Sequence, residues 1–405
     1  MKVDIKQQGR IFHLTWDDAV EMRVSRIREQ SNGDYRGLLM VSQNGRCLIN
    51  SMMNLSVSSA RASLSKSLNI QDNKHKWPVM LEEMCYHVTT RLATGESVQR
   101  ISSEADIEPQ EYTLYPLLPK GEATIVYGLG GTKKSYLALL ACIAVQLPWN
   151  DNPLGWVVNE SPGHCLYLDW ETNQNTLNRR LKWIVRGMGL PMLELDYRRC
   201  SRTLVDDIEP IQQQVFDSKP QLLVIDSAGY ACGVGDIKEQ MITTNFFGAI
   251  RELDTTTLII THTSKEGAGP YGSVYWTNSA RSVWETQGSQ VAGEKVSELA
   301  MFHRKSNDSG LFEPLGYEVA FDNMMQSTIF SLQDVKTMAG ITEGLSLRER
   351  IFEALKSGKM TSKELASEVN SSKASVETTL YRNSNTFVKM DNYWGIKSHV
   401  SDSNS

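Results

Sequence analysis

The chain has 405 residues, of which 40% are hydrophobic and 22% charged, and its formal net charge at pH 7 is -5. That length suits one sizeable core with one or two smaller units, and the acidic balance means that any nucleic-acid surface must be local. No stretch approaches the roughly 20 apolar residues of a membrane span, and the first ten residues lack the apolar segment of a secretory signal, so we expect a cytoplasmic protein without a membrane segment.

Residues 1–105 are predicted to form a separate α+β unit. The alternating stretches IFHLTW, AVEMRVSRI and GLLMVSQNGRCLI indicate strands, and Asn44-Gly45 in the last of them is typical of a hairpin turn. Helical spacing follows over residues 58–68 and 77–92. This unit contains no catalytic constellation. The composition of residues 102–119, rich in Ser, Glu and Pro, is typical of a linker.

Residues 106–334 are predicted to form an α/β core with a mainly parallel sheet flanked by helices. Strands alternate with helices from about residue 120, and parallel neighbours need a crossover that is usually a helix. Two later runs without a helix between them, KVSELAMFHRKS and YEVAFDNMMQSTIFSL, indicate an antiparallel extension. The predicted strands are ATIVYG, HCLYLDW, QLLVIDS and TTTLIITHTS, and the predicted helices cover residues 134–147, 175–189 and 237–253.

Residues 335–344 are expected to be a linker, and residues 345–400 a third unit. Three helical stretches, LSLRERIFEALKSG, MTSKELASEVN and SSKASVETTLYRN, precede TFVKMDNYWGIK, which indicates two strands around Asp391-Asn392. Thr361 and Glu364 have the spacing of a capping box. Three short helices followed by a β-wing describe a winged helix-turn-helix. This unit has nine Lys or Arg against six Asp or Glu, so it is locally basic.

The cysteines and tryptophans are expected to be structural. The six cysteines are scattered, without C-x-x-C spacing or a nearby histidine cluster, so they indicate neither a zinc site nor a disulfide framework and are expected to be buried thiols. Trp276 and Trp284 are expected in the core rather than stacked on bases, and Tyr393 and Trp394 are expected to close the wing onto the small unit.

The stretch YGLGGTKKSYLALL matches the phosphate-binding pattern G-x-x-x-x-G-K-[ST] at all but one position. Only the register on Lys134 places a hydroxyl, that of Ser135, after the key lysine. Lys134 would then reach the β- and γ-phosphates of ATP, and Ser135 would bind Mg²⁺. The residues expected to bind the nucleotide are Gly128, Leu129, Gly130, Gly131, Thr132, Lys133, Lys134 and Ser135.

Lys133 is the departure from the pattern, which has glycine at that position. If the backbone there takes a positive φ, a non-glycine residue costs about 1–2 kcal/mol. An added cation beside a polyphosphate is favourable, although solvent screens it when it is exposed. We therefore expect nucleotide binding to survive, and the rate of hydrolysis stays open.

Two further strands end in carboxylates. QLLVIDSAG has the form of a Walker B strand and carries Asp226, expected to bind Mg²⁺, out of the carboxyl edge of the sheet. In HCLYLDWET, Asp169 and Glu171 are two apart on a predicted strand and would share a face. Glu171 is expected to orient and deprotonate water with Asp169 as its support. The alternative for this pair is a salt bridge at the sheet edge.

These motifs resemble those of the RecA-like ATPases of the RepA and DnaB helicase group, over about residues 110–330. The stretches that carry the resemblance, in chain order, are YGLGGTKKSYLALL, LYLDWET, LLVIDSAG, THTSKEG, PYGSVYWTNSARSVWE and FHRKSNDSG. The likeness is greatest to RepA-type proteins of plasmids, phages and other mobile elements. It implies a hexameric ring that moves on single-stranded DNA, with each nucleotide between neighbouring subunits.

The resemblance also implies roles for single residues. His262 resembles the sensor that reads the γ-phosphate. Lys265, in the following loop, would contact phosphate or DNA, or is simply solvated. Arg281, Arg304 and Lys305 are alternative candidates for the finger that reaches into the adjacent subunit's site, where charge develops on the transferring phosphoryl group.

The third helix of a winged helix enters the major groove of duplex DNA. The residues expected to face DNA are Ser371, Ser372, Lys373, Ser375 and the wing residue Lys389. The alternative is a protein–protein module, because winged helices serve both purposes.

Three functions fit the sequence. The leading hypothesis is an ATP-hydrolysing DNA motor or loader, such as a helicase or translocase in the replication of a mobile element. It would act on single-stranded DNA and, through the winged helix, on duplex DNA. The second is an ATP-switched DNA-binding regulator with little turnover, which Lys133 and the winged helix favour. The third is a defence ATPase that senses nucleic acid.

Overall fold

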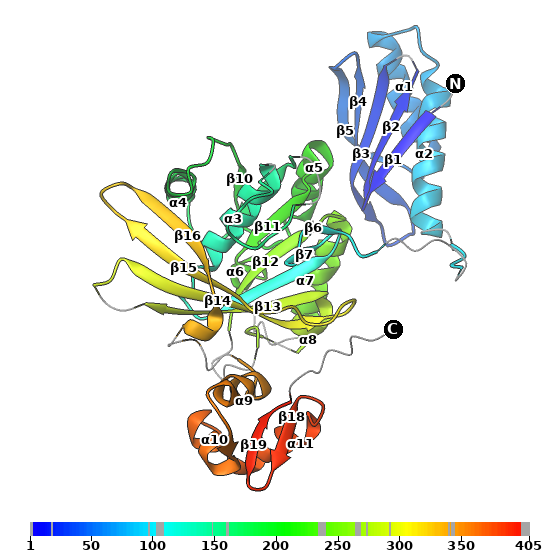
Figure 1. Cartoon of the computed structure of the whole chain (residues 1–405). Helices are drawn as coiled ribbons and strands as arrows, with labels where there is room; N and C mark the ends of the chain where they lie inside the picture. Colours follow the sequence, from blue (N-terminus) through cyan, green and yellow to red (C-terminus); the bar gives the residue numbers. More distant parts are fainter. Residues whose placement is uncertain are drawn as a thin grey trace, which may run out of the picture.

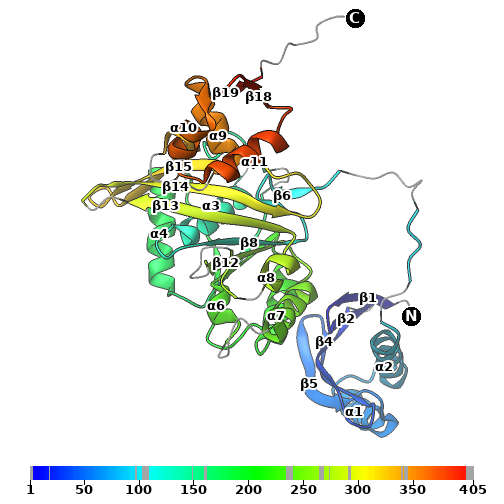
Figure 2. The same ribbon diagram turned by 90° about the horizontal axis from the view of Figure 1, so that it is seen from below.

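A computed structural model gives the arrangement of the chain, which is built around separate antiparallel and mixed sheets (Figure 1). An N-terminal unit and a C-terminal unit lie on different sides of a central core (Figure 2). The structure describes residues 3–17, 19–95, 98–102, 109–147, 149–158, 162–233, 240–263, 269–272, 274–290, 293–338, 341 and 345–397.

The N-terminal unit is a five-stranded antiparallel meander in the order β1-β2-β3-β4-β5, with two helices packed on one face. Asn44 and Gly45 form the turn between the last two strands with φ of 49° and 76°, as a two-residue hairpin requires. The predicted strands, helices and hairpin are confirmed, but β1 was not predicted because its sequence is mostly polar. The elements are β1 (Val3–Gln8), β2 (Ile11–Trp16), β3 (Val20–Glu29), β4 (Tyr35–Gln43), β5 (Arg46–Asn54), α1 (Ser58–Gln71) and α2 (Trp77–Thr94).

The outer face of this sheet contacts the core. The Gln8 side chain donates a hydrogen bond to the Leu253 carbonyl at 2.7 Å, and the His13 ring meets the Phe216 ring edge-on at 5.7 Å. Arg23 lies 3.7 Å from the carboxylate of Asp217. The N-terminal unit therefore rests on two core helices, α5 (Ile208–Ser218) and α7 (Gln240–Leu253).

The core contains a nine-stranded sheet in the order β10-β9-β11-β12-β8-β13-β14-β15-β16. Neighbours are parallel from β10 to β13 and antiparallel from β13 to β16, so the predicted mainly parallel sheet with an antiparallel extension is confirmed. The strands are β8 (Ala123–Gly128), β9 (Cys165–Asp169), β10 (Asp196–Arg199), β11 (Leu222–Asp226), β12 (Thr257–His262), β13 (Ser282–Gln290), β14 (Val296–Ser306), β15 (Leu315–Asp322) and β16 (Ser327–Gln333).

Helices cover both faces of this sheet. Alternate residues of β8 point to opposite faces, so Val126 packs against α3 (Lys134–Gln146) and α4 (Gln174–Gly187) while Ile125 packs on the side of α5 and α7. Burial on both faces explains why the parallel strands are continuous apolar runs. Two short helices, α6 (Ala228–Ala231) and α8 (Tyr275–Ser279), complete the core.

Three expectations for the core and its flanks need correction. Part of the supposed linker 102–119 forms β6 (Tyr112–Leu114) and β7 (Leu118–Pro119), because Leu114, Leu117 and Leu118 are buried. The later linker also packs: η1 (Val335–Thr337) begins it, and Val335, Met338 and Ile341 are buried against β14. YEVAFDNMMQSTIFSL, predicted as a single strand-like run, is two strands, β15 and β16.

Most of the structural side chains lie as expected. Trp276 and Trp284 are fully buried, which confirms their place in the core. Four cysteines are buried and Cys232 is half-buried, but the prediction was wrong for Cys47, which is exposed on the edge strand β5. Among the described helices, none is long and apolar enough to cross a membrane.

The C-terminal unit packs three helices against a three-stranded antiparallel sheet in the order β17-β19-β18. The capping box is confirmed, since the side chains of Thr361 and Glu364 each bond the other's backbone N–H. Trp394 is buried as expected, but the prediction for Tyr393 was wrong, because strand alternation leaves it 40% exposed. The elements are α9 (Leu347–Lys356), β17 (Met360–Thr361), α10 (Ser362–Glu368), α11 (Lys373–Arg382), β18 (Phe387–Met390) and β19 (Tyr393–Ile396).

Candidate functional site

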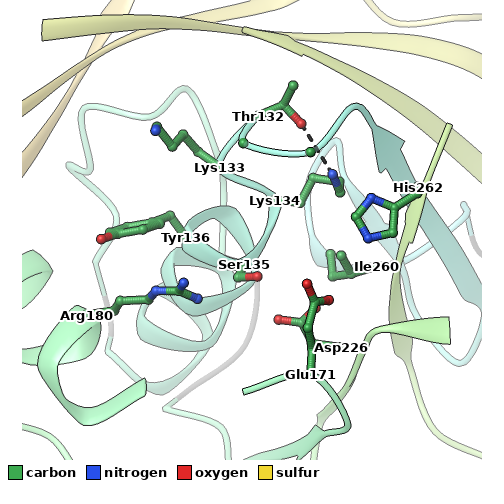
Figure 3. A pocket seen from close by; sticks show the side chains of 12 residues that line it. Thr132, Lys133, Lys134, Ser135, Tyr136, Glu171, Arg180, Asp226, Ile260 and His262 are labelled. Atoms are coloured by element: carbon green, nitrogen blue, oxygen red, sulfur yellow. Dashed lines mark hydrogen bonds between the residues drawn. The ribbon is translucent and has the colours of Figure 1, made fainter. Parts of the chain in front are cut away.

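The carboxyl ends of the parallel strands meet in one row. Backbone pairing sets Gly128 opposite His262, Ile260 opposite Asp226, and Asp226 opposite Asp169. Ligands of open α/β sheets bind outside this edge. A cleft of about 240 Å³ opens there (Figure 3). Its lining residues are Gly130, Gly131, Thr132, Lys133, Lys134, Ser135, Tyr136, Glu171, Arg180, Asp226, Ile260 and His262.

The phosphate loop, residues 128–135, joins β8 to the first turn of α3. Gly128 is required by space, since a Cβ there would lie 2.2 Å from Thr286 Oγ1 and 2.4 Å from the Thr286 carbonyl oxygen. The hydroxyls of Thr132 and Thr286 are hydrogen-bonded at 2.9 Å. The loop is therefore packed directly on β13, and the start of α3 lies in the cleft wall, where a helix N-terminus favours anions.

Lys134 lies at the base of the loop with only 7% of its surface exposed. Its Nζ donates to the carbonyl oxygens of Gly128 at 2.9 Å and Leu129 at 2.8 Å, and to Thr132 Oγ1 at 3.4 Å. Burial lowers the pKa of Lys134 to about 8, and the charges of Asp226 and Glu171 oppose this shift. The ammonium is thus held inside the loop, where the phosphates of a nucleotide would lie.

Lys133 has the left-handed conformation considered above, with φ 61° and ψ 20°. Its Nζ donates to Gln290 Oε1 at 3.2 Å and lies 5.1 Å from the centre of the Phe321 ring. Burial, and then the charge of Arg180, lower its pKa. In Figure 3 its side chain points away from Ser135 and Asp226. The lysine at the glycine position therefore forms part of the cleft rim and is directed to neighbouring strands.

Asp226 is buried and has one free oxygen. Tyr167 donates to Asp226 Oδ2 at 2.6 Å, whereas Oδ1 has no hydrogen-bond partner among the described residues. Burial raises the pKa of Asp226, and the neighbouring hydroxyls of Tyr167 and Ser135 oppose this shift. A hydroxyl and an unpartnered carboxylate oxygen fit Mg²⁺, which is usually held by one or two protein oxygens together with water and phosphate. No cluster of three or more His, Cys, Asp or Glu that could hold a metal ion occurs in the described part of the chain.

Glu171 lies beyond its strand, because β9 ends at Asp169. The prediction that the two carboxylates share a strand face was therefore wrong. Asp169 Oδ1 instead accepts the backbone N–H groups of Glu171 at 2.9 Å and Thr172 at 2.8 Å. Its Oδ2 accepts the hydroxyls of Thr172 at 2.7 Å and Tyr197 at 3.1 Å. Asp169 thus fixes the bend that carries Glu171 to the cleft.

His262 ends β12 and is exposed at the cleft beside the phosphate loop. Its carbonyl accepts the Tyr271 N–H at 2.7 Å, and the next residue, Thr263, donates its N–H to Gly128 at 3.2 Å. The strand end and the start of the phosphate loop are therefore linked. Lys265 lies outside the described residues.

Sequence reasoning missed Arg180 and Tyr136. The Arg180 guanidinium lies 5.3 Å from the centre of the Tyr136 ring, and both side chains line the cleft. They also line an adjoining hollow of about 310 Å³ together with Arg179 and Trp183. A signal was present, since α4 begins three residues after Glu171 and its first turns must pass close to the cleft.

The three candidate fingers lie outside the cleft of their own chain. Lys305 Nζ donates to the carbonyl oxygens of Thr277 at 2.8 Å, Asn278 at 3.2 Å and Ala280 at 2.6 Å, so it closes the end of α8. Arg304 bonds Glu285 at 2.7 Å and lies 4.7 Å from the centre of the Phe302 ring. The Arg281 side chain is 46% exposed, with a 3.5 Å contact to Glu122. Of these three side chains, Arg281 is the one held most weakly by contacts within its own chain.

The residues expected to face DNA all lie on the C-terminal unit. Ser372 caps α11 by accepting the Ser375 N–H at 3.1 Å. Lys373 lies 3.7 Å from Glu377, one turn further along α11. Lys389 lies over the rings of Tyr381 and Trp394, at 6.0 Å and 5.7 Å from their centres. The structure brings these residues together on one unit but not with the cleft.

Comparison with known proteins bears on the core. Residues 89–268 match the family model of the AAA domain. This match supports a P-loop ATPase, a class that binds nucleotide, typically with Mg²⁺. Its extent covers the phosphate loop, Glu171, Asp226 and His262. No curated protein matches the chain.

Among solved structures, the chain is similar to a KaiC-like protein from the hyperthermophilic archaeon Pyrococcus horikoshii. The two are 15% identical, the likeness covers 55% of this chain and 98% of that one, and the TM-score is 0.39. The assignment of the core therefore rests on the family match and on the geometry of the cleft.

The bond between Tyr167 and Asp226 leads to the first prediction. Tyr167→Phe removes a hydrogen bond to a charged group, which is worth about 1.5–3 kcal/mol, and frees the carboxylate to turn. We expect the Mg²⁺ concentration for half-maximal nucleotide binding to rise about tenfold or more, measured by titrating Mg²⁺ against a fluorescent ADP. Tyr197→Phe is the matched control, since it removes the corresponding hydroxyl from Asp169, and an equal effect of both variants would contradict this role for Tyr167.

Proposed function

We propose that this chain is an ATP-hydrolysing, ring-forming protein of the RepA and DnaB helicase-like group that acts on DNA. One observation carries the proposal: Lys134, Ser135, Glu171, Asp226 and His262, from four separate segments of the core, line a single cleft. The match to the AAA domain over residues 89–268 supports the ATPase. The resemblance of the sequence motifs to those of the RepA and DnaB helicase group supports the assignment to that group.

The side chains of the cleft have distinct roles in this proposal. Lys134 and the loop N–H groups hold the phosphates, and Ser135 and Asp226 would hold Mg²⁺, which neutralises phosphate charge when bound. Glu171 orients the attacking water and accepts its proton, with its bend fixed by Asp169. His262 reads the γ-phosphate from the strand next to the loop.

We propose that the nucleotide base lies in the adjoining hollow. Tyr136 and Arg180 line both that hollow and the phosphate cleft, so a nucleotide with its phosphates on the loop would extend between them. Aromatic rings and guanidinium planes are the groups on which bases stack. We therefore assign base contacts to Tyr136 and Arg180.

We assign the finger to Arg281. Lys305 would have to release three carbonyl oxygens to reach another subunit, and Arg304 would have to leave Glu285 and Phe302. Arg281 follows α8 at the start of β13, at the sheet edge opposite the cleft, because its N–H bonds the carbonyl of Ala123 at the first residue of β8. A residue at that edge suits the site of a neighbouring subunit better than its own.

The C-terminal unit is proposed to be a winged helix that contacts duplex DNA. The element order α9, β17, α10, α11, β18 and β19 supports this assignment. Lys389 on the wing is exposed beside two aromatic rings, whereas Lys373 has an acidic neighbour in Glu377. The wing lysine is therefore expected to contribute more to DNA affinity than Lys373.

An ATP-switched DNA-binding regulator is the second candidate. The observation that favours it is Lys133, which replaces the usual glycine and lies with φ 61° at the rim of the cleft. In that case the cleft would bind ATP and turn it over slowly. Steady-state turnover separates the two candidates.

The second prediction concerns turnover, measured as phosphate release with and without single-stranded DNA. Lys134→Ala should abolish nucleotide binding. Glu171→Gln should keep binding but lower the DNA-stimulated rate about 10²- to 10⁴-fold, since it removes the general base. If the wild type binds ATP but shows no stimulated turnover, the motor is excluded and the regulator remains.

The third prediction tests the finger by mixing inactive variants. Arg281→Ala and Glu171→Gln should each be inactive, but an equal mixture should recover activity, because about a quarter of the interfaces between subunits then carry both intact residues. A mixture of Lys134→Ala and Glu171→Gln is the control, since both lesions lie in one subunit's cleft. No recovery with Arg281→Ala would rule out its action in a neighbouring site.

The fourth prediction concerns duplex DNA, measured by fluorescence anisotropy over a series of salt concentrations. Lys389→Ala should weaken binding several-fold and lower the slope of log affinity against log salt by about 1, as loss of one phosphate contact requires. Lys373→Ala should have a smaller effect. Lys66→Ala, which changes an exposed lysine of the N-terminal unit, should have none, and equal behaviour of all three variants would favour a protein–protein module.

A further inference from the structure

We infer that Lys133 is a positioning residue, which ties the phosphate loop to the antiparallel part of the sheet instead of binding phosphate. The inference rests on the proposed function, since it concerns the same nucleotide site. It reverses the simplest interpretation of an extra lysine in this motif, which is an extra cation for the polyphosphate.

The direction of the side chain is the first observation. The Lys133 ammonium is 3.2 Å from Gln290 Oε1 on β13 and 5.1 Å from the centre of the Phe321 ring on β15. In Figure 3 the Lys133 side chain extends away from Ser135 and Asp226. To bind phosphate, Lys133 would have to leave both partners.

A second contact ties the adjacent loop residue to the same strand. Thr132 Oγ1 is 2.9 Å from Thr286 Oγ1, which in turn donates to the Tyr127 carbonyl at 3.0 Å. Thr286, Gly288 and Gln290 share one face of β13, because alternate residues of a strand do so. Gly288 lies directly against the loop, since a Cβ there would be in van der Waals contact with Thr132 Cα, at 3.5 Å. Residues 132 and 133 of the loop are therefore both bound to one face of β13. We call the contact between Lys133 and Gln290 the tie.

The position of the tie explains how it would affect nucleotide binding. Lys133 is the last residue before α3 and has a left-handed backbone that side-chain-bearing residues seldom adopt. The loop N–H groups can surround phosphates only while this turn is kept. A glycine would adopt the turn without help, whereas a lysine requires contacts that hold it there.

The tie also reaches the proposed finger. β13 begins at Ser282, directly after Arg281, and ends at Gln290. The phosphate loop of a subunit and the arginine that it offers to its neighbour are thus connected through one strand. A loosened tie should affect nucleotide binding first, since the loop is in direct contact with Gln290.

The test measures ADP and ATP affinity, KM and kcat in four single variants. Lys133→Met and Gln290→Ala both break the tie, and we expect each to weaken ADP and ATP alike by about three- to tenfold, because preorganisation of the loop is lost. KM should rise to the same extent with kcat within about twofold of wild type. Lys133→Gly should bind both nucleotides more tightly than Lys133→Met, since glycine adopts the turn without the contact to Gln290. Gln290→Glu should retain that contact as an ion pair.

A phosphate-binding Lys133 gives the opposite pattern. Lys133→Met and Lys133→Gly would then bind nucleotide equally weakly, and the affinity for ATP would fall more than the affinity for ADP. The affinities of Gln290→Ala would be those of wild type. That pattern overturns the inference, as do wild-type affinities in Lys133→Met and Gln290→Ala. The proposed function fails separately, if the wild type binds neither nucleotide.

Amide hydrogen exchange, measured without nucleotide, tests the tie even if the wild type binds neither ADP nor ATP. Exchange of the loop amides at residues 129–133 should be faster in Gln290→Ala than in wild type. It should be slower in Gln290→Glu than in Gln290→Ala. Equal exchange in all three proteins would overturn the inference.

Discussion

The pairing register of four parallel strands, β8, β12, β11 and β9, is the constraint on which the site depends. It brings Gly128 beside His262, and Asp226 between Ile260 and Asp169, although these residues are far apart in the sequence. A slip of one residue in β11 would turn Asp226 to the other face of the sheet. Apolar side chains buried on both faces prevent that slip, so the core that stabilises the sheet also sets the geometry of the cleft.

Strand β9 serves both carboxylates of the cleft. Its Tyr167 donates to Asp226 on the neighbouring strand, and its last residue, Asp169, holds the bend that carries Glu171. A buried carboxylate is costly unless it is hydrogen-bonded, which explains why burial raises the pKa of Asp226 while Tyr167 opposes the shift. One oxygen of Asp226 is thereby satisfied, and the other has no hydrogen-bond partner among the described residues. The two carboxylates of the proposed mechanism thus depend on a single strand.

Local patterns were predictable from the sequence, and contacts between distant strands were not. The spacing of Gly128, Lys134 and Ser135 and the strand ending in Asp226 needed only short-range information, as did the alternation of strands and helices. Tyr167 and Thr286 were missed because their partners are 59 and 154 residues away, so their roles exist only after the strands pair. The shared-face argument for Glu171 failed for a related reason, since where a strand ends depends on its neighbours and not on its own alternation.

Lys133 shows how a local rule can be broken at small net cost. The left-handed backbone costs a non-glycine residue about 1–2 kcal/mol. A hydrogen bond contributes a net stabilisation of about 0.5–1.5 kcal/mol, and an exposed cation–π contact about 0.5–1 kcal/mol. The contacts of Lys133 with Gln290 and Phe321 are therefore of the size needed to offset the cost of the left-handed backbone. A glycine loop keeps its shape independently of the rest of the sheet. In this chain the shape of the loop depends on β13 and β15, and the exchange of glycine for lysine therefore makes nucleotide binding sensitive to the antiparallel extension.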